Sequence, residues 1–322
     1  MWLRINFKRN LSQNRFPRNA MLRQHLKYRN DGNPRSFLRN AVGYLVFLIG
    51  TSLFLTKLPK MTYDVKTTCK LSGVCKVHDC ALRNFSLIIP GEYHHFLQYG
   101  HRLIRYMRYS VHPKPCEIIF VISNVPKGNI SALHEYKQDC IALGCDILLF
   151  HNRQNQALNR NIGASLSSGD LISFFDVDDL PHPKRFQVIQ EIFKKNPQIN
   201  GLLTGYIPGD SKEWQKMEEL FIDPNLDELN VVDSDFLSRE YVKLVNGSKS
   251  VAELKQYWCC EKVTGVNVHN AWATYRKVVF DRYQYNSSDE WYRAEDTGLN
   301  IQFFTNFEKL TYIDFPLGLY LH

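Results

Sequence analysis

The chain has 322 residues, of which 44 % are hydrophobic and 13 % aromatic, enough to bury one large core or two smaller ones. Its formal net charge of +8 is concentrated in residues 1–40, which carry ten Lys or Arg and a single acid, so the remainder is close to neutral. The basic character therefore belongs to a tail and does not describe a nucleic-acid-binding face. RNA binding by the tail is an alternative, but no folded motif of interleaved basic and aromatic residues supports it.

An uncharged segment follows the basic tail. Residues 41–56 contain no charged side chain, and Arg39, Lys57 and Lys60 flank them. As a helix this segment rises about 24 Å, close to the ~30 Å hydrocarbon core of a bilayer. A cleaved signal peptide fits less well, because a long basic tail precedes the segment. We expect a single transmembrane anchor at residues 41–57, with residues 1–40 in the cytosol and the later residues across the membrane.

The cysteines agree with that topology. All eight follow the anchor, and an even number in an exported region is typical of an oxidising lumen, although buried free thiols remain an alternative. The sequence does not reveal their pairing. Four sequons lie in the same region and are weak indications of glycosylation: Asn84, Asn129, Asn246 and Asn286.

After a stem at residues 58–83, apolar strands alternate with amphipathic helices. The predicted strands are 85–90, 117–123, 145–151, 171–175, 201–206 and 310–320. The predicted helices are 95–110, 130–142, 155–167, 184–195 and 297–304. This alternation indicates an α/β domain with a mainly parallel sheet and right-handed crossovers. Residues 207–262 are irregular, with helical pieces near 214–221 and 248–257, and suggest a substrate-facing insertion.

Three carboxylates directly follow the strand at 171–175: Asp176, Asp178 and Asp179. Packing carboxylates together is costly, and a hard divalent cation such as Mg²⁺ or Mn²⁺ offsets that cost well. In a parallel sheet, ligands bind at the carboxyl ends of the strands, where this acid loop (residues 176–179) is expected. The alternative is a solvated acidic turn that caps the helix beginning near Pro183.

Three further charged residues have both functional and structural interpretations. Arg160, in the helix that leads into the acidic strand, could neutralise a diphosphate or hold one of the carboxylates, or it could be an exposed helix Arg. Glu295 and Asp296 open the last helix, where acids commonly interact with the helix dipole. Their functional reading is a general base beside an acceptor hydroxyl.

Three sequence blocks together resemble the glycosyltransferases of the GT-A fold, most closely their family 2-like members, over roughly residues 84–322. The blocks are FSLIIP at 85–90, ALNRNIGASLSSGDLISFFDVDD at 157–179, and HNAWATYRKVVF at 269–280 followed by RAED at 293–296. The resemblance implies a GT-A, Rossmann-like, mainly parallel sheet flanked by helices, preceded here by the single transmembrane helix.

The resemblance also implies a metal site and a base. Asp176 and Asp178, supported by Asp179, would hold Mn²⁺ or Mg²⁺ against the diphosphate of the donor. His322 is the nearest candidate for the late metal-binding His of some GT-A enzymes. Asp296, or alternatively Glu295, would deprotonate the acceptor hydroxyl opposite the leaving group, which predicts inversion at the anomeric carbon.

The donor and acceptor sites follow from the same comparison. The donor would contact Pro90, Glu92, Asn124 and Arg160, besides Asp176 and Asp178. Ser123-Asn124 stand where family members often carry the Asp that reads the base, and Gly91-Glu92 replace a small polar pair. These departures leave the nucleotide open, with a UDP-sugar preferred. Asn270, Trp272 and Arg276 map to the acceptor site, and Trp272, Trp291 or Tyr292 could stack on a sugar or pack in the core.

The sequence therefore predicts a metal-dependent, inverting glycosyltransferase acting on a glycan, glycoprotein or glycolipid. We expect a single-pass type II protein of the Golgi or endoplasmic reticulum membrane with a lumenal catalytic domain. One alternative is an inactive, membrane-anchored glycan-binding protein of the same fold. Another is a haloacid-dehalogenase-like phosphatase, whose DxD also follows an apolar strand but opens its domain.

Overall fold

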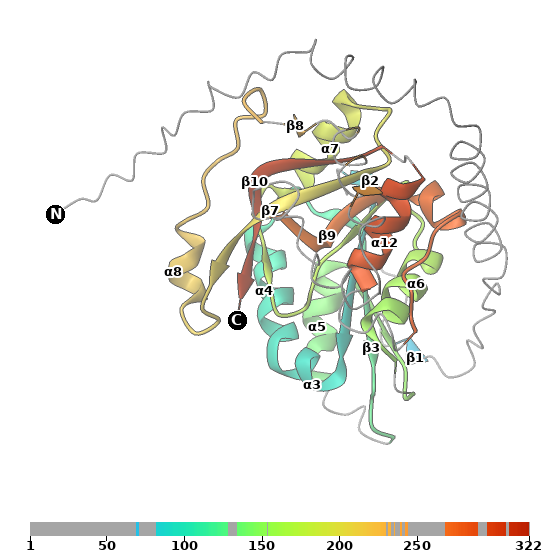
Figure 1. Ribbon diagram of the computed structural model, residues 1–322. Coiled ribbons are helices and arrows are strands. Elements are labelled where there is room, and N and C mark those ends of the chain that lie inside the picture. Colours follow the sequence, from blue (N-terminus) through green and yellow to red (C-terminus); the bar gives the residue numbers. More distant parts are fainter. Residues whose placement is uncertain are drawn as a thin grey trace, which may run out of the picture. The chain divides into compact units, whose positions relative to one another are not determined.

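A computed structural model describes residues 69–70, 82–127, 134–152, 154–229, 231–232, 235, 239, 242–243, 268–288, 295–306 and 309–321 (Figure 1). The chain divides into two units, Met1–Asp64 and Val65–His322, and every described residue lies in the second. The predicted tail and the predicted anchor at 41–57 lie outside the described residues. None of the described helices combines the length and the apolar character that crossing a membrane requires.

The centre of the unit is one ten-stranded sheet with the strand order β1-β4-β3-β2-β5-β9-β7-β10-β6, and β8 pairs with β10. The strands before the acid loop are β1 (Cys69–Lys70), β2 (Leu82–Glu92), β3 (Pro115–Ser123), β4 (Cys145–Leu149) and β5 (Leu171–Phe174). The strands after it are β6 (Leu180–Pro181), β7 (Gly201–Gly209), β8 (Val231–Val232), β9 (Val268–Arg276) and β10 (Leu310–Leu321). All the predicted strands are present.

The sheet is mixed, whereas the sequence predicted a mainly parallel one. β2 pairs in parallel with β3 and β5, β3 with β4, and β7 with β10. β9 is inserted between β5 and β7 and runs antiparallel to both. Nothing in the local sequence indicates the direction of this strand.

The helices also follow the sequence prediction closely. They are α3 (Tyr93–His95), η2 (Phe96–Gly100), α4 (His101–Ser110), α5 (His134–Leu143), α6 (Gln156–Leu166), α7 (Arg185–Lys195), α8 (Trp214–Glu218), η4 (Lys277–Asp281) and α12 (Glu295–Thr305). The predicted helical piece at 248–257 lies outside the described residues. Figure 1 shows α12 beside β9, in agreement with their contacts.

Helix α6 is held unusually close to the sheet. The side chain of Asn155 caps its start by accepting a hydrogen bond from the Leu158 backbone N–H at 3.0 Å. The helix packs on β2 and β3, and a Cβ placed on Gly163 would lie 2.2 Å from Cγ2 of Ile88. Only glycine permits this approach, which sets the distance from the sheet to Arg160 on the same helix.

The strand directions decide where the site lies. β5, β7 and β10 run the same way as β2 and β3, so their carboxyl ends meet at one edge of the sheet. The acid loop follows β5 at this edge, and the first residues of β9 reach the same edge from the opposite direction. Parallel strand ends are the usual place for ligands in such sheets.

Candidate active site

The three carboxylates of the acid loop have different surroundings. Asp176 accepts a hydrogen bond from a terminal nitrogen of Arg160 at 2.9 Å. Asp179 is 1 % exposed, and its two oxygens accept hydrogen bonds from Trp272 Nε1 at 3.0 Å and from the Leu321 backbone N–H at 2.9 Å. Asp178 is half-buried, and no hydrogen bond or ion pair to its carboxylate occurs among the described residues. Asp178 is therefore the carboxylate of the loop with free oxygens.

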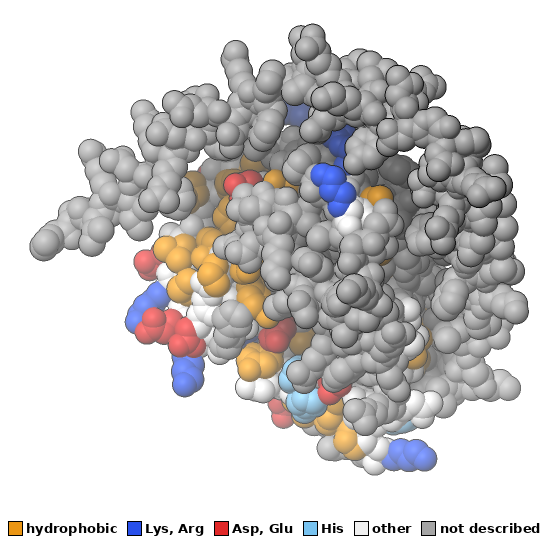
Figure 2. All heavy atoms as spheres, in the orientation of Figure 1, with side chains coloured by type: hydrophobic (Ala, Val, Ile, Leu, Met, Phe, Trp, Pro, Cys, Tyr) orange, Lys and Arg blue, Asp and Glu red, His pale blue; other side chains and the backbone are white. Residues whose placement is uncertain are grey.

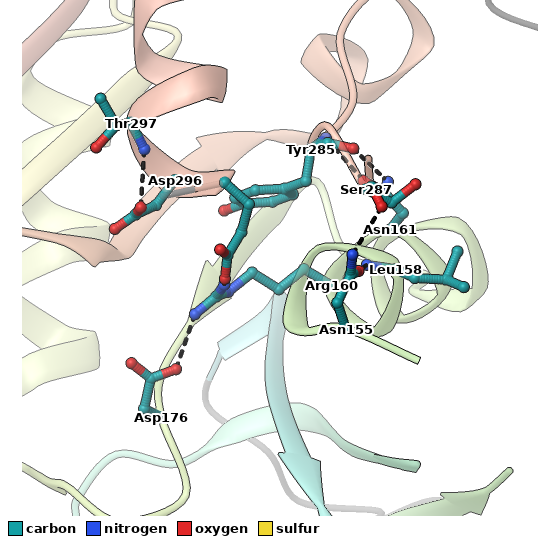
Figure 3. A network of polar contacts seen from close by, with 10 residues as sticks. Asn155, Leu158, Arg160, Asn161, Asp176, Tyr285, Ser287, Asp296 and Thr297 are labelled. Carbon is teal, nitrogen blue, oxygen red and sulfur yellow. Dashed lines mark hydrogen bonds and ion pairs between the residues drawn. The ribbon is translucent and has the colours of Figure 1, made fainter. Parts of the chain in front are cut away.

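Arg160 joins the acid loop to the start of α12. Its side chain is 3 % exposed, and its second terminal nitrogen lies 2.5 Å from Glu295 Oε1, 135 residues away in the chain. The guanidinium also lies over the ring of Tyr285, 5.5 Å from its centroid, as Figure 3 shows. Of the two functional readings that the sequence left open, the structure shows the carboxylate-holding one, because both terminal nitrogens are engaged by acids.

The segment around Tyr285 is held onto α6 by two side-chain amides (Figure 3). Asn161 donates to the Tyr285 carbonyl at 2.8 Å and accepts from the Tyr285 N–H at 2.9 Å. Asn155 donates to the Ser287 carbonyl at 2.7 Å. These bonds keep the Tyr285 ring against Arg160 and so make the ion pairs part of a rigid polar network.

The two acids at the start of α12 are not equivalent. Glu295 is 8 % exposed and is engaged by Arg160. Asp296 is half-buried, and its Oδ1 accepts the Thr297 backbone N–H at 2.8 Å. Ion pairs to Asp296 are absent among the described residues. Of the pair, Asp296 has one carboxylate oxygen without a hydrogen-bond partner among the described residues, and its role as the base stays a prediction.

Burial raises the pKa values of several of these carboxyls. Desolvation, with the Glu295 charge next in importance, raises the pKa of Asp296 to about 7, against the lowering effect of Arg160. Desolvation likewise raises the pKa of Asp176 to about 6, although Arg160 opposes it. The pKa of Asp179 is raised well above its usual range by burial and by the charges of Asp178 and Asp176. Buried carboxyl groups that lie close to one another are therefore the main electrostatic feature of the site.

Two arginines that the sequence analysis did not single out also shape the site. Arg102 on α4 donates to the Asp178 carbonyl oxygen, and its guanidinium lies 5.1 Å from the centroid of the Tyr99 ring. Arg185, fully buried at the start of α7, donates to Trp272 O at 2.6 Å and to Thr204 Oγ1 at 3.1 Å. Nothing in the local sequence distinguishes these arginines from surface ones, since only the packing shows what they bind.

The predicted donor residues lie at the ends of β2 and β3. Pro90 is buried in β2, Glu92 is half-buried at the end of that strand, and Asn124 follows β3 with φ = 61°. Asn159 on α6 ties the two strand ends together, because its amide donates to Gly91 O at 3.2 Å and to Ser123 Oγ at 3.1 Å. The structure thus brings the predicted donor residues to the same edge as the acid loop.

The predicted acceptor residues are not brought together. Trp272 is 0 % exposed and stacks on Phe175 with ring centroids 4.7 Å apart, so its ring cannot receive a sugar. Arg276 pairs with Leu171 at the start of β5, on the opposite edge of the sheet, because β9 is antiparallel. Its guanidinium donates to Ile199 O at 2.8 Å instead. The Asn270 side chain, Trp291, Tyr292 and His322 lie outside the described residues.

The fold is an α/β domain built on one mixed sheet, with the acid loop at the carboxyl ends of its parallel strands. Residues 100–245 match the model of glycosyl transferase family 2, which confirms the predicted family 2-like glycosyltransferase. The matched range contains Arg160 and the acid loop and ends before Glu295 and Asp296. A comparison with curated proteins finds no match.

Several solved structures are similar to this chain. TarS 1-349 from S. aureus in complex with UDP-GlcNAc is 12 % identical with a TM-score of 0.48, over 74 % of this chain and 58 % of that one. The mannosyltransferase PcManGT from Pyrobaculum calidifontis, in complex with GDP-Man and Mn²⁺, is 13 % identical with a TM-score of 0.45, over 75 % and 59 %. Glucosyl-3-phosphoglycerate synthase from Mycobacterium tuberculosis, in complex with Mn²⁺ and UDP, is 13 % identical with a TM-score of 0.46, over 74 % and 72 %. The chain spans about 60 % of the length of the TarS fragment.

Proposed function

We propose that this glycosyltransferase moves a sugar from a nucleotide-sugar donor to an acceptor hydroxyl, with a divalent ion at the acid loop and Asp296 as the base. The observation that carries the proposal is the Arg160 bridge between Asp176 and Glu295. It joins the end of β5 to the start of α12 and leaves Asp178 and Asp296 without ion pairs among the described residues. The proposed metal ligand, Asp178, and the proposed base, Asp296, therefore carry carboxylates that no ion pair among the described residues engages.

The residues present fit a hard divalent ion. Five carboxyl groups gather around two arginines, and most of that negative charge is buried: Asp176, Asp178, Asp179, Glu295 and Asp296 face Arg102 and Arg160. No three His, Cys, Asp or Glu side chains in the described part of the chain are gathered closely enough to form a complete metal site. A site completed by phosphate oxygens of the donor is the ordinary arrangement for Mg²⁺ and Mn²⁺.

Asp178 would be the principal ligand, with Asp176 beside it. The oxygens of Asp179 are already occupied by Trp272 and Leu321, so this residue would mainly hold the loop in place. His322 is the residue after Leu321 and remains a candidate ligand. Bound at this loop, Mn²⁺ or Mg²⁺ would act as a Lewis acid that neutralises the departing diphosphate.

Unpartnered hydrogen-bond acceptors support a nucleotide site at the ends of β2 and β3. The side-chain oxygens of Asn124, Gln154 and Asn159 are buried without a hydrogen-bond partner. The three residues lie near the end of β3, because Ser123 Oγ donates to the Gln154 backbone carbonyl and accepts from the Asn159 amide, and Asn124 is the next residue. Buried orphan acceptors require donors, and the N–H groups of a base and the hydroxyls of a ribose are suitable ones. We propose a UDP-sugar as the donor.

Asp296 would remove the proton of the acceptor hydroxyl as that oxygen attacks the anomeric carbon. A pKa of about 7 suits this role, because a base works best when its pKa lies near the operating pH. Attack from the side opposite the leaving group inverts the configuration of the anomeric carbon. Glu295 would not compete for the role, since Arg160 holds it.

We also propose that the domain works in the lumen of the Golgi or endoplasmic reticulum, tethered by residues 41–57, on a glycan, glycoprotein or glycolipid. The uncharged segment between basic flanks supports the tether. Cys116 is disulfide-bonded, and such bonds persist mainly in oxidising compartments.

The test is a screen of nucleotide sugars with the full-length chain, measuring release of the nucleoside diphosphate with Mn²⁺, with Mg²⁺ and with a chelator. We expect release that depends on the ion and is lost in Asp178→Asn. Asp170→Asn is the control and should keep full activity, because Asp170 is an exposed acid just before β5, at the end of that strand remote from the acid loop. Binding of donor with no release from any sugar would favour the inactive glycan-binding protein, and full activity of Asp178→Asn would overturn the metal assignment.

A further inference from the structure

Arg102 on α4 holds the acid loop from a segment that precedes it by 76 residues in the chain. Its guanidinium donates a hydrogen bond to the backbone carbonyl oxygen of Asp178. The carboxylate of the same aspartate forms no hydrogen bond or ion pair among the described residues. The arginine therefore binds the backbone of the proposed metal ligand and leaves its carboxylate oxygens available.

The three acids of the loop are held in two ways. Asp176 and Asp179 are held through their carboxylates, which accept hydrogen bonds of 2.9 to 3.0 Å. Asp178 is held through its backbone instead, by Arg102. Helix α4 also contacts β6, the short strand that directly follows the acid loop. The position of the Asp178 backbone therefore depends on this helix and not on the neighbouring acids alone.

The Arg102 guanidinium is itself fixed. It lies 5.1 Å from the centroid of the Tyr99 ring, three residues earlier in the chain. An aromatic face attracts a guanidinium, and stacking restricts the long side chain that carries it. Burial disfavours this cation, and the charges of Asp178 and Asp179 stabilise it. Arg102 therefore presents a charged and oriented donor to the loop.

A π-helical turn sets the direction of this donor. The turn is η2, which directly precedes α4. Figure 2 shows histidine side chains at the surface over α3, the turn before it, whereas Phe96 is 0 % exposed and packs on Phe120 of β3 with ring centroids 5.5 Å apart. Gly100 permits this packing, because a Cβ there would lie 2.7 Å from the Phe96 ring. Because a π turn changes the angular spacing along a helix, it decides where Tyr99 and Arg102 point, and such turns are frequent at functional sites.

We infer that Arg102 is a positioning residue that holds the acid loop in the shape that presents the Asp178 carboxylate to a divalent ion. This inference rests on the proposed metal-dependent transfer and adds a residue that the transfer requires. Groups that bind behind metal ligands orient those ligands, and replacing one commonly lowers metal affinity about 10–100-fold. A cation at this place also offsets the repulsion among the three carboxylates before the ion binds.

The direction of the effect distinguishes positioning from charge alone. A guanidinium repels a divalent ion, so an Arg102 that acted only through its charge would weaken Mn²⁺ binding, and its removal would tighten it. An Arg102 that fixes the Asp178 backbone has the opposite effect, because without it the ion itself must order the loop. The two explanations therefore predict changes of opposite sign.

The experiment compares Arg102→Met, Arg102→Gln and Arg102→Lys in the full-length chain. Met removes the donor, Gln is too short to reach the same carbonyl, and Lys keeps both the charge and a donor. Arg105→Met is the matched control, because Arg105 is an exposed arginine on the same helix. Mn²⁺ is titrated with and without UDP, and the free ion is measured by electron paramagnetic resonance. Amide hydrogen exchange of residues 176–181 is followed by mass spectrometry.

We expect the Kd for Mn²⁺ to rise about 10–100-fold in Arg102→Met and Arg102→Gln, to change much less in Arg102→Lys, and to stay the same in Arg105→Met. The rate of nucleoside diphosphate release should recover at saturating Mn²⁺, because the ion then orders the loop. An unchanged or lower Kd would overturn the inference. So would a rate that saturating Mn²⁺ does not restore, since Arg102 would then act on the transfer step itself.

The exchange measurement keeps the inference separate from the proposed function. Amides of the acid loop should exchange faster in Arg102→Met and Arg102→Gln than in the wild type and in Arg105→Met. If the wild-type chain binds no Mn²⁺, the proposed metal site fails by itself. Arg102 is then judged on the exchange alone, where faster exchange in the loop supports the anchoring and unchanged exchange refutes it. If one of the two neutral variants fails to fold, the other decides.

Discussion

Replacing Arg160 with Met would remove the cation that Asp176 and Glu295 share. The guanidinium is 3 % exposed, and its two terminal nitrogens lie 2.9 Å and 2.5 Å from those carboxylates. Met fills much of the same volume, so the change is mainly one of charge. Both acids would then be buried without a counter-ion.

Breaking a buried ion pair from one side costs about 3–5 kcal/mol, because the remaining charge stays desolvated. For a domain of this size about 2–4 °C of Tm corresponds to each kcal/mol, which predicts a fall of roughly 6–20 °C. The control is Arg108→Met, because Arg108 pairs with Asp139 at 3.1 Å but is 35 % exposed. A surface pair of this kind contributes about 0–1 kcal/mol.

The loss should also depend on pH. Arg160 lowers the pKa of Asp176, which burial has raised to about 6, so its removal raises that pKa further. A carboxyl whose pKa is higher in the folded state than in the unfolded state binds more protons when folded, so stability falls as pH rises between the two values. The deficit of Arg160→Met should therefore be larger at pH 8 than at pH 5.

Thermal and urea unfolding of the full-length chain, monitored by near-UV circular dichroism, measure these differences. Adding Asp176→Asn and Glu295→Gln to Arg160→Met should recover much of the stability, because no charge is then left buried, while activity stays lost. A loss below about 1 kcal/mol in Arg160→Met, or the same loss in Arg108→Met, would refute the bridging role.

Three other predictions follow from the same geometry. The rate of sugar transfer should rise with pH through about 7, since Asp296 must be ionised to act as the base. Asp296→Asn should abolish transfer and keep donor binding, and a wild-type rate that does not change with pH would contradict this assignment. The raised pKa of Asp296 also means that its charge opposes folding above that pH, so Asp296→Asn should raise the stability at pH 8 by about 1–2 kcal/mol, measured by urea unfolding. Gly163→Ala should lower stability by about 1–3 kcal/mol, because its methyl group would meet Ile88 in spite of the better helix propensity of Ala; an unchanged Tm would show that α6 can move away from β2.

Much of the fold was predictable because its signals are local. Apolar runs such as 117–123 and 171–175 became β3 and β5, and the amphipathic stretch at 184–195 became α7. Each pattern indicates which side chains of a segment face the core, and this pattern depends only on the sequence of the segment itself. The acid loop was found for the same reason, since carboxylates directly after a buried strand are conspicuous in the sequence.

The direction of β9 was not predictable, and neither were the roles that depend on it. An antiparallel β9 carries Arg276 to the far edge of the sheet and buries Trp272 under the acid loop. A strand looks the same in sequence whichever way it runs, because side chains alternate between the two faces in both directions. The sequence therefore could not show that Trp272 is buried and that Arg276 lies at the other end of the strand.

The sequence by itself predicted six of the strands, the main helices, the acid loop and the acid pair at the start of the last helix, but it did not predict β9. The tertiary structure decided which of these acids remain available, because burial and pairing join residues far apart in the chain. Arg160 engages Glu295 across 135 residues, and Asp179 is held by Trp272 and Leu321. Asp178 and Asp296 form no ion pair among the described residues. Whether an acid is paired depends on contacts between distant segments, so local sequence patterns cannot predict it.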